Sequence, residues 1–90
     1  MIIPRKIRIG GHLYNVEVVP SWDGFEQGDC GQTFYEKGLI CINSNLIESE
    51  KWSTLIHEAM HVMNKTLNHE LLDSLSEQIY QFLAANDLLE

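Results

Sequence analysis

The spacing of apolar residues changes its period halfway along the chain, and this change limits the possible folds. In the first half, the segment "KIRIGGHLYNVEVV" alternates apolar and polar residues on both sides of Gly10-Gly11. Such alternation predicts two strands joined by a tight turn. In the second half, apolar residues recur every three or four positions from Trp52 to Met63, and again from Leu72 to Leu83. This spacing predicts two helices.

A second hairpin is expected in "QTFYEKGLICIN", after the loop "PSWDGFEQGDCGQ", which is rich in glycine and aspartate. Residues 36–38 supply its turn and residues 39–42 a largely apolar strand. The expected fold is therefore α+β, with a small antiparallel sheet of two hairpins followed by two packed helices. Because 90 residues suffice for one domain, we expect a single unit with a β-rich half, 1–47, and a helical half, 48–90.

The two helices are expected to form an antiparallel pair that turns near Thr66, since residues 64–68 break the helical pattern. Ser49, followed by the acidic Glu50, is a plausible cap for the first helix. The apolar stripe of the second helix is expected to face the core; it comprises Leu72, Leu75, Ile79, Phe82 and Leu83.

Charge and composition exclude several functional classes. The net charge is −7, and the segment 66–90 contains five acidic residues but no lysine or arginine. We therefore expect no nucleic-acid partner. The N-terminal segment contains proline and charges, and no apolar run approaches the length of a membrane span, so neither export nor membrane insertion is expected. Cys30 and Cys41 lack the CxxC spacing and are expected to be reduced thiols in a cytoplasmic protein.

The most specific signal is "HEAMH", in which Glu58 directly follows the first of two histidines, His57 and His61. On a helix these two histidines share one face, so two imidazole nitrogens can reach one ion. Glu58 projects about 100° further round, where it can take a proton from a water that the metal activates. A chance occurrence of the motif is the alternative. The apolar neighbours favour a metal, because three uncoordinated polar groups beside the core would be costly to desolvate.

A catalytic zinc needs a third protein ligand, and the sequence leaves three candidates. A histidine six residues after the second motif histidine is excluded, because Leu67 stands there. Asp73 is favoured, since in an antiparallel helix pair it lies level with the histidines and near the edge of the core. His69 lies about one turn away, and Glu77 is rotated further toward solvent. The competing roles are a helix-dipole acid for Asp73 and a cap or first-turn residue for His69.

Four segments, "KIRIGGHLYNVEVV", "GLICIN", "TLIHEAMHVMN" and "LSEQIYQFLAAND", resemble the short single-domain metallopeptidases proposed in phages and prophages, which are minimal relatives of the zincins. The resemblance covers nearly the whole chain, and "HEAMH" and the closing "IYQFL" with "ND" are its most specific parts. It implies a zincin-like fold in a protein of the bacterial host cytoplasm. It also implies His57 and His61 as zinc ligands and Glu58 as general base, and members of the group often carry an acid where Asp73 stands.

Two functions therefore remain as expectations. The first is a zinc-dependent metallopeptidase that requires Zn²⁺ and acts on a protein or peptide substrate, with Glu58 as general base. The second is a catalytically silent, metal-stabilised binding or regulatory module on the same scaffold. The small size of the chain favours the second, because little remains to build a cleft wall beyond the motif helix.

Overall fold

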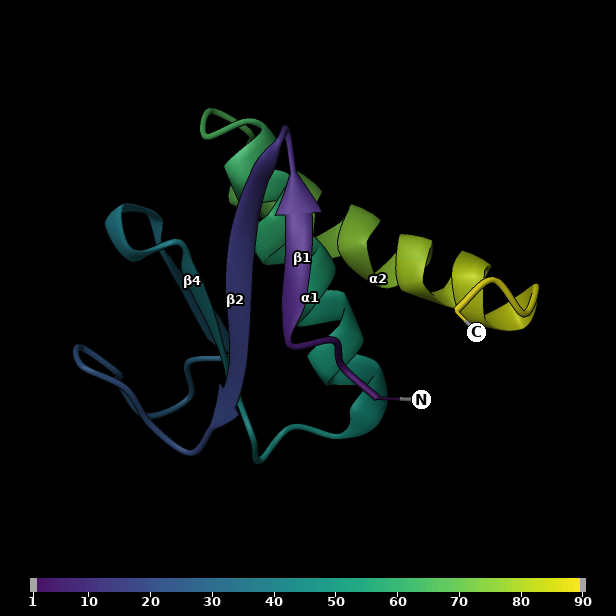
Figure 1. Ribbon diagram of the computed structural model, residues 1–90. Coiled ribbons are helices and arrows are strands. Elements are labelled where there is room, and N and C mark those ends of the chain that lie inside the picture. The colour runs from purple at the N-terminus through teal and green to yellow at the C-terminus, as the bar shows by residue number, and fades with distance from the viewer. Residues whose placement is uncertain (1, 90) are drawn as a thin grey trace.

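Two β-hairpins build the sheet of this α+β fold, which the computed structural model describes for residues 2–89 (Figure 1). The first hairpin joins β1 (Lys6–Ile9) to β2 (His12–Val19) through two glycines with φ of 57° and 86°. The second joins β3 (Gly31–Phe34) to β4 (Leu39–Asn43) through a short 3-10 helix, η1 (Tyr35–Lys37). Both predicted hairpins are confirmed.

The sheet is mixed, with the strand order β1-β2-β4-β3. Pairing within each hairpin is antiparallel, but β2 and β4 pair in parallel, with Val16 opposite Ile40. The expectation of a wholly antiparallel sheet was therefore wrong for this central pair. The loop between β2 and β3 carries the chain past the central position to the far edge, so the second hairpin joins the first through β4. As a result, β3 is an edge strand.

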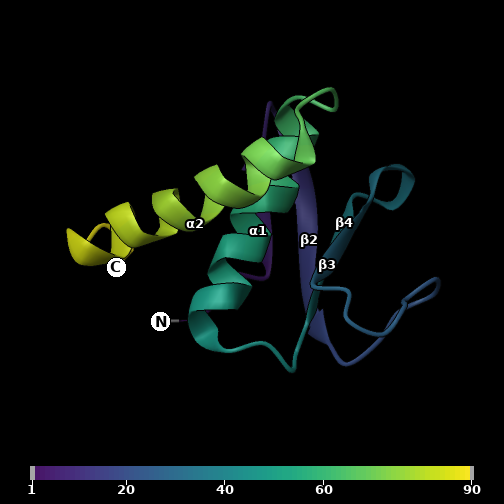
Figure 2. The same ribbon diagram turned by 180° about the vertical axis from the view of Figure 1, so that it is seen from behind.

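Two helices, α1 (Glu48–Met63) and α2 (His69–Ala85), follow the sheet and lie on the same side of it (Figures 1 and 2). The predicted cap, Ser49, lies inside α1. Instead, the Glu50 carboxylate accepts a hydrogen bond of 3.4 Å from the backbone N–H of Ile47, the residue before the helix. The side chain of Asn68 caps α2 by accepting hydrogen bonds from the backbone N–H groups of Glu70 and Leu71.

The hydrophobic core lies between α1 and the sheet, and α2 packs mainly against α1. Leu72 of α2 is fully buried, but Leu75 is 37% exposed and Phe82 is 61% exposed. The predicted core stripe of α2 was therefore wrong for these two residues. The physical reason is that α2 crosses α1 near its own start, after which its C-terminal end projects away from the sheet (Figures 1 and 2). The core itself comprises Ile3, Ile9, Tyr14, Val16, Ile40, Ile42 and Leu55.

Within residues 2–89, no helix combines the length and the apolarity that crossing a membrane requires. Cys30 and Cys41 are both free thiols, as expected, and Cys41 is buried in the central strand β4. The compartment in which the chain acts stays a prediction.

Candidate metal centre

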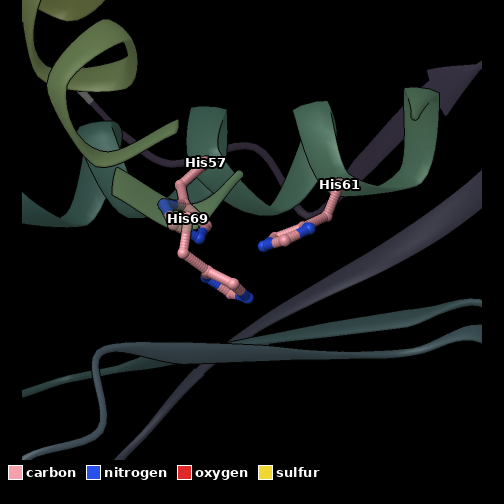
Figure 3. A group of neighbouring side chains, drawn as sticks. All are labelled: His57, His61 and His69. Atoms are coloured by element: carbon pink, nitrogen blue, oxygen red, sulfur yellow. The ribbon is translucent and has the colours of Figure 1, made fainter. Parts of the chain in front are cut away.

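Three histidines meet where the start of α2 crosses α1 (Figure 3). His57 and His61 lie one turn apart on α1, and His69 is the first residue of α2. One ring nitrogen of each histidine lies within 4.8 Å of the other two. A tetrahedral zinc ion with Zn–N distances of about 2.1 Å holds its nitrogen ligands roughly 3.4 Å apart. Modest side-chain rotations therefore bring these three nitrogens to coordination distance.

Asp73 orients the first of these histidines. Its Oδ1 lies 2.8 Å from Nδ1 of His57, whose side chain is only 13% exposed. A carboxylate that accepts the Nδ1–H bond fixes the tautomer in which Nε2 is unprotonated and can bind a metal. Asp73 was the favoured third ligand from the sequence. The group of three close donor atoms contains His69, the competing candidate, whereas Asp73 contacts Nδ1 of His57 and is not a member of that group.

The surroundings of the His61 side chain favour its neutral form. Burial lowers the pKa of His61 below its ordinary value, the Glu58 carboxylate opposes this shift, and the neighbouring His57 and His69 reinforce it. Imidazole coordinates a metal in its neutral form. The lowered pKa therefore favours binding, because fewer protons have to be displaced at neutral pH.

Glu58 is nine-tenths buried and is fixed by the edge strand of the sheet. The hydroxyl of Thr33, on β3, donates a hydrogen bond of 2.7 Å to Oε1 of Glu58. Its other oxygen, Oε2, accepts no hydrogen bond from any side chain or backbone group among residues 2–89, and Glu58 lines the cleft described below. The carboxylate therefore has one oxygen held in place and one available for proton transfer.

A glycine permits the close approach between β3 and α1 that brings Thr33 to Glu58. A Cβ atom on Gly31 would lie 2.6 Å from Cγ2 of Thr54 and 2.9 Å from the backbone oxygen of Cys41. Both distances are shorter than van der Waals contact, and the second atom belongs to the backbone, which cannot move aside easily. The strand thus reaches the motif helix only because residue 31 has no side chain.

A cleft of about 660 Å³ opens beside the histidines, between α1, α2 and the segment 28–31. Its volume lies within the range typical of small-molecule and cofactor pockets. On α1 the lining extends from Ser49 to Glu58, so the cleft runs from the motif toward the N-terminal end of that helix. On α2 it includes His69, Asp73, Ser76, Glu77, Tyr80 and Gln81.

Asn43, at the end of β4, holds the loop wall of this cleft. Its side-chain Nδ2 donates a hydrogen bond of 2.9 Å to the backbone oxygen of Asp29, and its backbone N–H donates one of 2.8 Å to the oxygen of Cys30. Asn43 is itself buried. The loop before β3 is therefore tied to the central strand at the point where it faces the two helices.

Comparison of the chain with protein-family models, with curated proteins and with solved structures finds no match. What this site can do therefore follows from its own residues and their geometry.

The structure brings together most of the residues that the sequence singled out. His57, His61 and Glu58 lie side by side on α1, and Asp73 joins them from α2. Glu77 lines the cleft but does not belong to the group of close donor atoms. Sequence reasoning missed Gly31 and Thr33, because nothing in a short strand shows which of its residues will face a helix. The "GQT" segment that contains them carries no distinctive motif.

Proposed function

We propose that this chain is a zinc-dependent peptidase in which His57, His61 and His69 hold Zn²⁺ and Glu58 is the general base. One observation carries the proposal: imidazole nitrogens of His57 and His61 from α1 and of His69 from α2 lie within 4.8 Å of one another, and α1 also presents the carboxylate of Glu58 with a free oxygen. Three histidine ligands and an open fourth position are a ligand set of catalytic zinc. Relative to the sequence-based prediction, the third ligand changes from Asp73 to His69.

The protein side chains have distinct tasks in this proposal. Zinc at the three histidines supplies polarisation of a peptide carbonyl and acidification of water toward a pKa of about 7. Glu58 takes the proton from the attacking water through its free oxygen and passes it to the leaving amine. Thr33 holds the other oxygen of Glu58, which keeps the base in one orientation. Asp73 keeps His57 in the tautomer that binds metal.

The edge strand β3 offers a means of holding a peptide substrate. Within residues 2–89 this strand pairs with β4 alone, so its outer edge has backbone groups that are free to pair. An extended peptide can add to such an edge as a further strand. Because Thr33 of β3 contacts Glu58, a peptide paired there has its backbone close to the general base.

The proposed substrate class is a protein or peptide in the cytoplasm of a bacterial host. Support comes from the resemblance of the chain to phage and prophage metallopeptidases. Nucleic acid is a poor alternative, because the acidic helical half of the chain, which forms the cleft with segment 28–31, has no basic stripe to neutralise phosphates.

The metal is tested first. Protein purified without chelator is expected to contain about one zinc ion per chain, because a small domain with three convergent imidazoles binds zinc tightly. The double variant His57→Ala, His61→Ala is expected to contain almost none when both proteins are measured by plasma mass spectrometry. Equal zinc in the two proteins would mean that the histidines do not bind metal.

The Glu58→Gln variant separates catalysis from metal binding. Glutamine has nearly the same shape but is a poor base, so zinc content and melting temperature should stay close to those of the wild type. Cleavage of a proteome-derived peptide mixture, read by mass spectrometry, should fall at least about a hundredfold. If the zinc-loaded wild type makes no cleavage that the variant lacks, the chain is a metal-stabilised binding module and not a peptidase.

A further inference from the structure

The cleft beside the histidines is lined by carboxylates on each of its walls. Asp29 comes from the loop before β3, Glu50 from α1, and Asp73 and Glu77 from α2, in addition to the general base Glu58. No lysine or arginine belongs to the lining. Five carboxylates exceed the charge of one doubly positive ion, so the cleft stays negative even when zinc is bound.

Two carboxylates of the cleft, those of Glu50 and Glu77, have no basic partner in the described part of the chain. Among residues 2–89, the pair between His57 and Asp73 is the sole contact between a basic and an acidic side chain within 4 Å. Glu50 and Glu77 therefore face the cleft without a countercharge. Four of the six lysines and arginines lie at other sites: Lys65 lies over the ring of Tyr35 and Lys37 near that of Phe34, while Arg5 and Lys6 line a separate hollow beside β2.

The thiol of Cys30, which lines this cleft, is influenced by the same carboxylates. Burial raises the pKa of Cys30, and the carboxylates of Glu50, Asp73 and Asp29 raise it further. These three carboxylates belong to three different segments of the chain. Carboxylates from all three walls of the cleft therefore lie close enough to act on one thiol.

The cleft also differs from an ordinary acidic surface because it adjoins the candidate metal centre. It has a volume of about 660 Å³, it contains His57 and His69, and it is lined by the nine-tenths-buried Glu58, whose Oε2 has no hydrogen-bond partner in the described chain. A side chain that enters this space from a peptide bound at the histidines meets Glu50, Glu77 and the ring of Tyr80.

We propose that the cleft selects peptides that carry a lysine or arginine next to the peptide bond held at His57 and Glu58. This inference rests on the proposed function for the position of the bound peptide. The carbon stem of a lysine or arginine can pack along Tyr80, while its charged end approaches the carboxylates of Glu50 and Glu77. An acidic side chain at the same position is repelled by those carboxylates.

The binding experiment uses the zinc-loaded full chain with Glu58→Gln, which cannot turn over the peptide. Two fluorescent octapeptides that differ only at one central position, lysine in one and glutamine in the other, are titrated and followed by anisotropy. The lysine peptide is expected to bind about fivefold more tightly, and raising the salt concentration should reduce this preference. Adding Glu50→Gln and Glu77→Gln should abolish it.

The matched control adds Glu17→Gln and Glu36→Gln instead, which changes the net charge equally but removes two exposed carboxylates outside the cleft. This control should keep the fivefold preference. Equal affinity for the two peptides, or an equal loss of preference in the control, would overturn the inference.

Cleavage of the same two peptides by zinc-loaded wild type separates this inference from the proposed function. Cleavage of both peptides at equal rates, together with equal binding, would refute the selection of cationic peptides and leave the peptidase proposal standing. A fivefold binding preference without any cleavage would refute the peptidase proposal and leave a cleft that selects cationic peptides.

Discussion

The two helices contribute unequally to the candidate metal centre. On α1, His57 is mostly buried, His61 is half-buried and Glu58 is buried against β3. On α2, His69 is exposed, and Asp73, with 73% of its side chain exposed, contacts the site through one pair with His57. The site residues on α1 are therefore held in place by packing against the core and the sheet. The placement of the site residues on α2 depends mainly on where that helix starts.

The unequal burial of the two helices' residues suggests a way for a chain of 90 residues to assemble a cluster of three histidines. The two motif histidines and Glu58 are fixed when α1 packs on the sheet, because their relative placement follows from one rigid helix. The third histidine has to be supplied by a helix that packs on α1 and not on the sheet. Substitutions on α1 and β3 should therefore affect folding, whereas substitutions on α2 should mainly affect metal affinity.

The largest effect is expected for His69. Replacing His69 by alanine should weaken zinc affinity at least about a hundredfold, since one of three proposed ligands is lost, while the melting temperature of the metal-free protein changes little.

Asp73→Ala should weaken zinc affinity about 10- to 100-fold, which is typical for a residue that orients a ligand. Glu77→Ala is the control and should change it less than about threefold. Competition with a chromogenic chelator measures all three, and a larger loss for Asp73→Ala than for His69→Ala would make Asp73 the third ligand.

A substitution on the sheet side should affect folding itself. Gly31→Ala places a Cβ atom against Thr54 and the backbone of β4, which should lower the free energy of unfolding by about 1–3 kcal/mol. Urea denaturation of the metal-free protein measures this loss. Adding Thr54→Ser removes the methyl group that lies 2.6 Å from the new atom and should restore part of the stability. A fully stable single variant would show that β3 does not approach α1 as closely as described.

The smallest effect is expected at the start of α2. Asn68→Ala removes the side chain that accepts hydrogen bonds from Glu70 N–H and Leu71 N–H, so α2 should lose about 1 kcal/mol of stability. Because His69 is the next residue, zinc affinity should fall slightly as well. Asn68→Asp keeps the acceptor and should behave like the wild type in both thermal unfolding and zinc titration. Unchanged stability in Asn68→Ala would mean that packing against α1 alone fixes the start of α2.

The local part of the fold and the core of the motif could be predicted from the sequence. The Gly10-Gly11 turn, the η1 hairpin and both helices follow from short-range patterns, and so does the placement of Glu58 next to His57. The parallel pairing of β2 with β4 could not be predicted, because it joins two hairpins that the intervening loop leaves free to combine in several ways.

The position of His69 could not be predicted for a related reason. An antiparallel helix pair places His69 about one turn away from the motif histidines, whereas in the structure the start of α2 brings His69 close to both of them, and α2 then diverges from α1 (Figure 2). The same divergence leaves Phe82 exposed. Both errors therefore come from one quantity, the crossing angle of the helices, which depends on side-chain packing across the interface and not on the sequence of either helix alone.

The parallel pair at the centre of the sheet also has a consequence for the order of folding. Each hairpin closes from neighbouring residues, but the pairing of Asn15 with Leu39 requires closure of a long loop. Contacts that are distant in sequence form slowly, and they form after local structure. Among residues 2–89, the strand that carries Thr33 joins the sheet only through β4, so Glu58 acquires its hydrogen bond to Thr33 from a strand that reaches the first hairpin only when the two hairpins are joined.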